Sequence, residues 1–123
     1  MEIRLVRLTD RFDDACAFYG DLLGWPITHE WPADEHQGRG RLFGFGNARV
    51  ELIEIVDGSA AQPLTGGFLS VEVTGIDAVR DRFVAAGHTL DGDIVVQPWG
   101  HRSFTLHDPA GASIVFFEAP EVA

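Results

Sequence analysis

The chain has 123 residues, and 46% of them are hydrophobic, which is enough for the core of one domain. Nineteen acidic residues against nine arginines and no lysine give a net charge of −10. This charge argues against nucleic acid as a partner, because such binding needs cationic contacts with phosphate. No apolar run reaches the roughly 18 residues of a membrane span, no basic leader is apparent, and a single cysteine excludes an internal disulfide framework. We therefore expect a cytoplasmic protein without a membrane partner. The arginine bias is typical of a GC-rich bacterial genome, and the acidic surface serves solubility or attracts cationic ligands.

Turn residues and apolar spacing divide the first half of the chain into one helix and four strands. The first strand is predicted at residues 2–8. Apolar residues from Phe12 to Leu23 then follow the spacing of an amphipathic helix, with Asp10 as its N-cap and Gly24 as its stop. Alternating patterns predict three more strands at residues 25–31, 39–45 and 49–56.

The second half repeats this order. A strand is predicted at residues 67–74, and apolar residues from Ile76 to Ala86 predict a helix that Thr74 caps and Gly87 ends. Three strands follow at residues 93–97, 102–107 and 112–118.

An internal repeat relates the two halves at an offset of 64 residues. Helix positions 12, 15, 19 and 22 map onto 76, 79, 83 and 86, and strand positions 5, 50 and 52 map onto 69, 114 and 116, almost all of them apolar. We predict an α+β fold of two tandem βαβββ modules, forming a cupped mixed β-sheet with one helix per module on the outside. The modules are residues 1–56 and 67–118, joined by a linker at 57–66. They form a single domain, because neither half would bury its sheet alone.

Two segments carry more specific motifs. The predicted first helix ends in Phe18-Tyr19-Gly20-Asp21-Leu22-Leu23-Gly24-Trp25, and Gln97-Pro98-Trp99-Gly100-His101-Arg102 is followed by Asp108-Pro109-Ala110-Gly111. With the repeat, these motifs make the chain resemble the vicinal oxygen chelate superfamily of glyoxalases, ring-cleaving dioxygenases and bleomycin-resistance proteins, with the bleomycin-resistance branch closest. On the residues alone, 108–111 is a good hairpin turn, and Trp99 is equally well a core aromatic.

The resemblance implies a divalent metal held by four side chains, from the first and last strands of both modules. The matching positions are Arg4, Glu51, Phe68 and Val115. Only Glu51 can donate to a metal, since arginine stays protonated and the other two lack donor atoms. We therefore expect no metal and no cofactor. The five histidines form no close pair, and the best partial alternative is His107 with Glu51.

Alternation assigns one face of each strand to the helices and the other to a cleft. The cleft face receives Arg41, Ser103 and Thr105, and most of the candidate ligand-binding residues lie on it as well. These candidates are Arg4, Phe43, Phe45, Arg49, Glu51, Phe68, Trp99, His107, Val115 and Phe117. Aromatic groups with a few polar ones are typical of a small-molecule site. Alternatively, Phe43, Phe45 and Phe117 fill a core or a dimer interface.

Within this set, we expect Trp99, Phe43 and Phe68 to form a stacking surface. We also expect Arg4 to pair with Glu51, because a guanidinium fork matches a carboxylate. The alternative is that Arg4 extends into solvent and leaves Glu51 free to meet a ligand cation.

These features favour a metal-independent protein of the bleomycin-resistance type that binds a small aromatic or cationic molecule, such as an antibiotic or another natural product. One alternative is a glyoxalase-like lyase, isomerase or dioxygenase with a divergent metal site or with Glu51 as general base. Another is an interaction module with a vestigial cleft. The resemblance also implies a homodimer.

Overall fold

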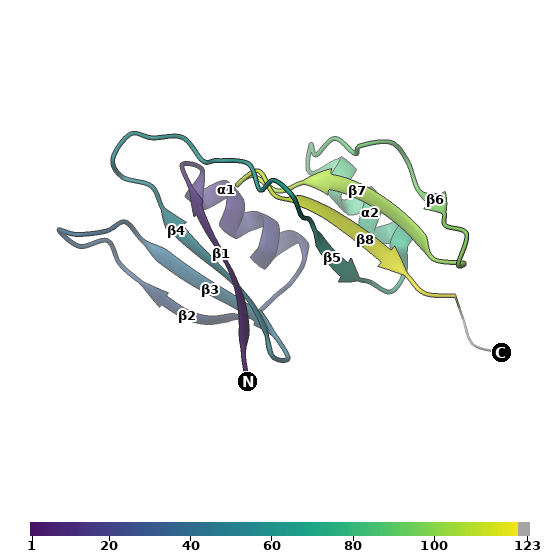
Figure 1. Ribbon diagram of the computed structural model, residues 1–123, viewed down its shortest axis with the longest axis horizontal. Coiled ribbons are helices and arrows are strands. Elements are labelled where there is room, and N and C mark those ends of the chain that lie inside the picture. The colour runs from purple at the N-terminus through teal and green to yellow at the C-terminus, as the bar shows by residue number, and fades with distance from the viewer. Residues whose placement is uncertain (121–123) are drawn as a thin grey trace. The chain divides into compact units, whose positions relative to one another are not determined.

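The computed structural model describes residues 1–120 and divides into two compact units. The first unit contains Met1–Pro63 and Pro109–Gly111, and the second contains Leu64–Asp108 and the chain from Ala112 onward. Each unit pairs one four-stranded mixed sheet with helix (Figure 1). In residues 1–120 no helix is both long enough and apolar enough to cross a membrane.

The first unit runs β1 (Ile3–Thr9), α1 (Phe12–Ala17), a π-helical turn η1 (Phe18–Leu22), β2 (Ile27–Trp31), β3 (Gly40–Phe45) and β4 (Ala48–Glu54). The strand order in the sheet is β1-β4-β3-β2. β1 is parallel to β4, and the other neighbours are antiparallel.

The second unit repeats the pattern with β5 (Leu69–Glu72), α2 (Ile76–Ala85), β6 (Val95–Val96), β7 (Arg102–His107) and β8 (Ser113–Glu118). Its strand order is β5-β8-β7-β6, with β5 parallel to β8. The predicted α+β class and the two βαβββ modules are confirmed. Most strands start or end one or two residues from their predicted bounds, and β7 matches its prediction.

Both predicted helix N-caps are wrong. The N-cap position of α1 is Arg11 rather than Asp10, and the preceding Thr9 hydroxyl accepts from the Arg11 N–H at 2.9 Å. The N-cap position of α2 is Gly75 rather than Thr74. The α2 terminus is capped from outside the helix, by the carboxylate of Glu118 at the end of β8, which accepts from the N–H groups of Gly75 and Ile76 at 2.6 and 3.3 Å. A distant carboxylate thus satisfies donors that a local cap would normally bind.

Each helix covers one face of its own sheet, and the repeat governs this packing. The residues that strand alternation assigns to the helix face are buried or half-buried in both units: Val50, Leu52, Leu69, Val71, Phe104, Leu106, Ile114 and Phe116. The helices contribute fully buried rings, Phe18 and Tyr19 in the first unit and Phe83 in the second. The predicted hairpin turn is also present, since Gly111 has φ +90° and the Asp108 carboxylate accepts from the Ala112 N–H at 2.7 Å.

The face predicted for β3 is wrong. Phe43 pairs with Val50 and Arg41 pairs with Leu52, so both side chains lie on the helix face. Phe43 is 1% exposed and contacts Tyr19 with ring centroids 6.2 Å apart. Phe45 has the same parity but lies 72% exposed at the strand end.

The cause of this error is the length of one hairpin. Gly40 pairs with Ile53, whereas Ser103 pairs with Phe117, so the second hairpin is one residue longer and the repeat offset on this strand is 63. Because strand side chains alternate, a slip of one residue moves every side chain to the other face.

Candidate functional site

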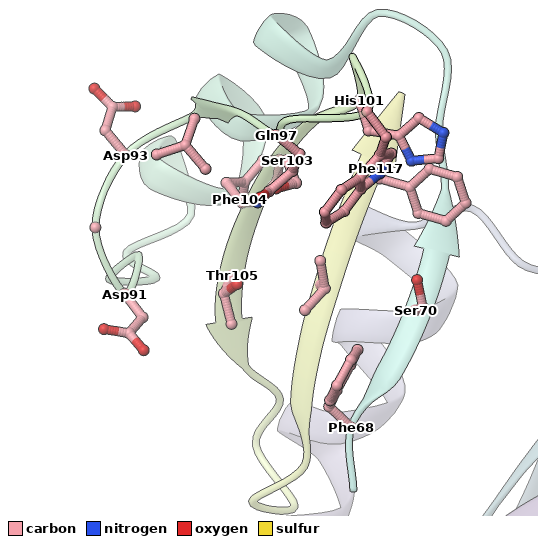
Figure 2. Close-up of a pocket in the computed structure, with 14 residues that line it drawn as sticks. Phe68, Ser70, Asp91, Asp93, Gln97, His101, Ser103, Phe104, Thr105 and Phe117 are labelled. Carbon is pink, nitrogen blue, oxygen red and sulfur yellow. The ribbon is translucent and has the colours of Figure 1, made fainter. Parts of the chain in front are cut away.

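A pocket of about 460 Å³ lies on the open face of the second unit's sheet, opposite α2. It is lined by Phe68, Ser70, Asp91, Gly92, Asp93, Val95, Gln97, Trp99, His101, Ser103, Phe104, Thr105, Val115 and Phe117. Its labelled side chains come from β5, β7, β8 and the segment that leads into and out of β6 (Figure 2).

One wall of the pocket is aromatic. The His101 imidazole stacks on the Phe117 ring with centroids 4.9 Å apart and planes 7° apart, and the Trp99 ring meets His101 edge-on at 6.2 Å. Trp99 is 65% exposed and Phe68 is 63% exposed, so large apolar faces are open to a ligand. The alternative that Trp99 is a core aromatic is therefore wrong.

The position of Trp99 follows from the local turn. The Gly100 N–H donates to the Gln97 carbonyl at 2.9 Å, and the Gln97 N–H donates to the His101 carbonyl at 2.7 Å. Proline suits the second position of such a turn, and Gly100 has φ +93°, which most other residues avoid. The Pro98-Trp99-Gly100 segment thus closes the β6–β7 hairpin, carries the indole at its tip, and places His101 on the pocket side just before β7.

The pocket floor is polar. The Gln97 amide nitrogen donates to the Ser103 hydroxyl at 2.9 Å, and Ser103 itself is 4% exposed. Thr105 continues the same face of β7. Figure 2 draws Gln97 and Ser103 near His101 and Phe117, with Asp91 and Asp93 on the loop beyond them.

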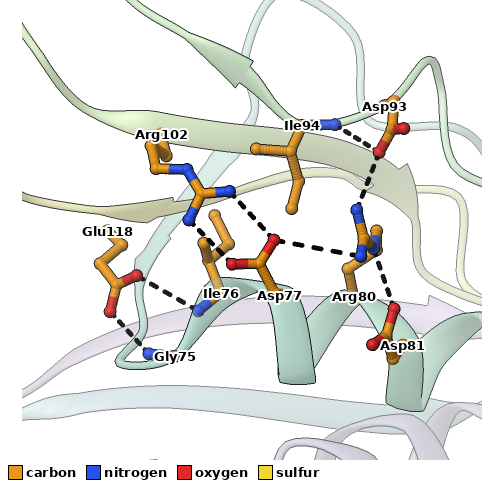
Figure 3. Close-up of polar contacts among 9 residues, drawn as sticks. All are labelled: Gly75, Ile76, Asp77, Arg80, Asp81, Asp93, Ile94, Arg102 and Glu118. Carbon is orange, nitrogen blue, oxygen red and sulfur yellow. Dashed lines mark hydrogen bonds and ion pairs between the residues drawn. The ribbon is translucent and has the colours of Figure 1, made fainter.

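The acidic side of the pocket rim is anchored to α2 (Figure 3). Arg80 donates to Asp93 at 3.3 Å and to Asp81 at 3.0 Å. The Ile94 N–H and the Arg80 guanidinium lower the pKa of Asp93. Asp91, by contrast, makes no ion pair within residues 1–120, while its N–H donates to the Thr105 carbonyl at 2.7 Å. One carboxylate on this rim is therefore held by the helix, and the other is available to a ligand cation.

At the equivalent position of the first unit, the Trp31 side chain lies over the open face of the sheet. Trp31 pairs with Gly40 in the first sheet, at the position where Val95 pairs with Ser103 in the second sheet. A Cβ atom added at Gly40 would lie 1.8 Å from the Trp31 ring, so the indole lies directly on the bare backbone of Gly40. The smaller Val95 leaves this space open in the second unit.

The four positions that the resemblance implies for a metal do not fit one. In the first unit, Arg4 donates to Glu51 at 2.7 Å, which confirms the predicted pair, and Arg4 also pairs with Glu2. These two carboxylates raise the pKa of Arg4, so a fixed positive charge occupies the place of a ligand. In the second unit, Phe68 and Val115 are pocket-lining apolar residues. No group of three or more His, Cys, Asp or Glu side chains within residues 1–120 could hold a metal ion.

The candidate ligand-binding residues therefore fall into separate places. Four of them line the pocket: Phe68, Trp99, Val115 and Phe117. Three are charged residues on the first unit. Arg4 pairs with Glu51, and the Arg49 guanidinium donates to the Gly46 and Ala48 carbonyls. His107 is exposed at the end of β7 and does not line the pocket, and Phe43 lies in the core of the first unit. Whether any of these residues binds a ligand stays a prediction.

Sequence reasoning missed several pocket residues, chiefly Gln97, His101 and Asp91. Gln97 and His101 flank Trp99 in a quoted motif, and a hairpin closed by Pro98-Trp99-Gly100 would have placed both on the side of Ser103. No sequence signal marks Asp91, which reaches the rim through its backbone contact with Thr105.

A second hollow of about 600 Å³ lies on the first unit, where Val6, Leu8 and Ile53 meet the loop at residues 36–38. No Phe, Tyr or Trp side chain lines it. Its Glu54 carboxylate is bound by Arg39 at 2.7 Å, and its Arg7 guanidinium donates to the Gln62 and Ala110 carbonyls at 2.8 and 2.7 Å. In this hollow both of these charged groups are therefore already bound by other parts of the protein.

Comparison with solved structures places the fold among known proteins. The lactoylglutathione lyase of Agrobacterium tumefaciens matches with a TM-score of 0.70 and 22% identity over 96% of this chain and 92% of that one. TnmS3, an antibiotic binding protein from Streptomyces sp. CB03234, matches with a TM-score of 0.72 and 19% identity over 98% and 96%. TioX from Micromonospora sp. ML1 matches with a TM-score of 0.73 and 18% identity over 98% and 99%.

Identities this low support the fold alone, and no curated protein sequence matches significantly. A family model described as the Glyoxalase/Bleomycin resistance protein/Dioxygenase superfamily matches residues 4–116. The match spans nearly the whole chain and confirms the resemblance found in the motifs, so this protein belongs to the glyoxalase/bleomycin resistance protein/dioxygenase superfamily.

Proposed function

We propose that this protein is a metal-independent binding protein for an aromatic small molecule of the antibiotic or natural-product class. The observation that carries the proposal is the pocket of about 460 Å³ with Trp99, His101 and Phe117 along one wall. Covering exposed aromatic faces with a flat ligand lowers the free energy of the complex, and binding of this kind requires no covalent bond to be made or broken. The presence of an antibiotic binding protein among the fold neighbours agrees with this reading.

Charge favours a cationic ligand. The chain carries a net charge of −10, and Asp91 and Asp93 both line the pocket. An acidic surface raises the local concentration of cations and speeds their encounter with the pocket. A cation can also lie over an aromatic face, which adds attraction beyond area burial.

The proposal assigns no role to a metal, because the donor set does not support one. The Arg4 guanidinium brings positive charge to a position that would need a lone pair, and its partner Glu51 is engaged with it at 2.7 Å. The side chains of Arg4 and Glu51 are 44% and 13% exposed.

The experiment uses 9-aminoacridine, a flat cationic aromatic, and cyclohexylamine, a cation without an aromatic ring. Binding is followed by tryptophan fluorescence and by calorimetry, in wild type and in Trp99→Ala. We expect 9-aminoacridine alone to bind, and Trp99→Ala to weaken it by about 5- to 150-fold, the range for an anchoring aromatic of about 1–3 kcal/mol. Trp25→Phe is the matched control, because Trp25 packs against Tyr19 in the first unit.

Equal binding of both cations, or binding that Trp99→Ala leaves unchanged, would refute the aromatic pocket as the site. Asp91→Asn tests the charge: it should weaken 9-aminoacridine and reduce the salt dependence of binding.

We further propose that the protein acts as a homodimer in a bacterial cytoplasm. Support comes from β1, which lies at an edge of its sheet and exposes Ile3, Val6 and Leu8. Sedimentation equilibrium tests the dimer, with an expected mass of twice 13.5 kDa. A single species at the monomer mass at micromolar concentration would contradict it.

A further inference from the structure

The pocket of the second unit holds one pair of side chains that the aromatic wall does not explain. Gln97 and Ser103 lie on the same face of the β6–β7 hairpin and are joined by a hydrogen bond of 2.9 Å. Ser103 is 4% exposed, and both residues line the pocket. Polar side chains placed beside an aromatic wall are the feature that usually fixes the orientation of a ligand.

The hydrogen-bonding capacity of this pair can be counted. A glutamine amide offers two donor hydrogens and an acceptor oxygen, and a serine hydroxyl offers one donor hydrogen and accepting lone pairs. The Gln97 amide donates to the Ser103 hydroxyl, so the Ser103 hydrogen and the Gln97 amide oxygen stay available. Neither group has another side-chain partner within residues 1–120.

The result does not depend on how the amide is oriented. If the amide is turned over, Ser103 donates to the amide oxygen, and the amide NH₂ group becomes the available donor while the Ser103 oxygen becomes the available acceptor. In both orientations the pair presents at least one donor and at least one acceptor, side by side, to whatever occupies the pocket.

The neighbours of the pair define where such a ligand would lie. Ser103 pairs across the sheet with Phe117 on one side and with Val95 on the other. Phe117 carries the stacked His101 ring. A flat ligand that covers this wall therefore has an edge directed at Gln97 and Ser103, as the labelled residues in Figure 2 indicate.

We propose that Gln97 and Ser103 select ligands that carry a neighbouring hydrogen-bond donor and acceptor on one edge of an aromatic ring system, as in a lactam or a cis amide. This inference rests on the proposed function and names the class of ligand for that site. A ligand without such an edge displaces the water from the pair and leaves buried polar groups unpaired. Sites built around buried hydrogen-bonding groups reject ligands that lack the matching group much more strongly than apolar sites reject a change in size.

The test compares isoquinolin-1(2H)-one, an aromatic lactam, with its N-methyl derivative, which keeps the rings and the carbonyl but lacks the donor. Binding is measured by two-dimensional NMR titration of the ¹⁵N-labelled protein, which reports separately on the Trp99 indole N–H and the Gln97 side-chain amide. We expect the lactam to bind about tenfold more tightly than the N-methyl compound, which corresponds to about 1.4 kcal/mol. The Gln97 amide signals should shift with the lactam.

Two variants separate hydrogen bonding from steric exclusion of the methyl group. In Ser103→Ala and in Gln97→Leu the preference for the lactam should fall to within about twofold, and either variant suffices if the other fails to fold. Ser113→Ala is the matched control, because Ser113 lies on the same face of β8 as Phe117 but outside the pocket lining. This variant should keep the wild-type preference.

The outcomes distinguish this inference from the proposed function. If both compounds bind equally, or if the preference survives in Ser103→Ala and Gln97→Leu, the polar selection is overturned and the aromatic pocket stands. If neither compound shifts the Trp99 signal at millimolar concentration, the aromatic pocket itself is refuted, and the selection with it.

Discussion

Truncating Phe43 to alanine separates the core of the first unit from the candidate ligand pocket. The ring is 1% exposed, pairs across the sheet with Val50, and lies against Tyr19 and the backbone of Gly20. The contact with Gly20 is close, since a Cβ atom added there would lie 3.0 Å from the ring. Phe43→Ala should therefore destabilise the fold without changing the binding of 9-aminoacridine by the folded protein.

The expected loss of stability can be worked out from burial. A buried phenylalanine removes roughly 150–250 Å² from water, and most of that area is lost in alanine. At about 25 cal/mol per Å² this corresponds to about 3–5 kcal/mol, the range measured when large core side chains are cut to alanine. For a chain of 123 residues the melting temperature should fall by roughly 10–20 °C.

Urea denaturation followed by circular dichroism measures the free energy of unfolding, and calorimetry measures binding at a temperature where the variant is folded. Phe43→Leu is the fallback if the alanine variant does not fold, and it should show a smaller loss in the same direction. Trp99→Ala is the matched variant from the pocket, where stability should change little and binding should fall. A loss of stability below about 1 kcal/mol for Phe43→Ala, or a loss of affinity in the folded variant, would refute the placement of Phe43 in the core.

Three further predictions concern the ionic contacts and the metal. The Arg102 guanidinium lowers the pKa of Asp77 from its ordinary 3.8, so this ion pair stabilises the fold above that pH and the contribution is lost as the pH falls through the lowered value. Asp77→Asn should therefore reduce the free energy of unfolding at pH 7. The difference from wild type should vanish in strong acid, as urea denaturation at each pH would show. Glu118→Ala should lower the free energy of unfolding by about 1–2 kcal/mol, because two helix N–H groups of α2 lose their acceptor, and an unchanged urea midpoint would contradict the cap. Elemental analysis of the purified protein should find no stoichiometric transition metal, since Arg4 holds Glu51, and about one zinc, nickel, manganese or iron per chain would overturn that expectation.

The two modules could be predicted from the sequence because the pattern that specifies them is local. Helical spacing and strand alternation repeat at one offset, and burial depends on which residues of an element are apolar. The repeat also supported the positions that the resemblance implies for a metal, since an offset of 64 relates Arg4 to Phe68 and Glu51 to Val115. The contact between Arg4 and Glu51 was predicted from that resemblance and from the match of a guanidinium with a carboxylate, and it forms because β1 and β4 are neighbours in the sheet.

Three features were decided only by tertiary structure. The cap of α2 comes from Glu118, 42 residues after Ile76 in the chain, so no pattern near the helix could reveal it. The face of Phe43 depended on a difference of one residue between two hairpins, which alternation within a single strand cannot detect. In the second unit the smaller Val95 lines the pocket at the position where Trp31 lies over Gly40 in the first, a difference in side-chain volume on neighbouring strands. Sequence thus determined the elements and most of their apolar faces, which depend on local spacing, whereas the pairing of strands decided the face of β3 and which side chains meet.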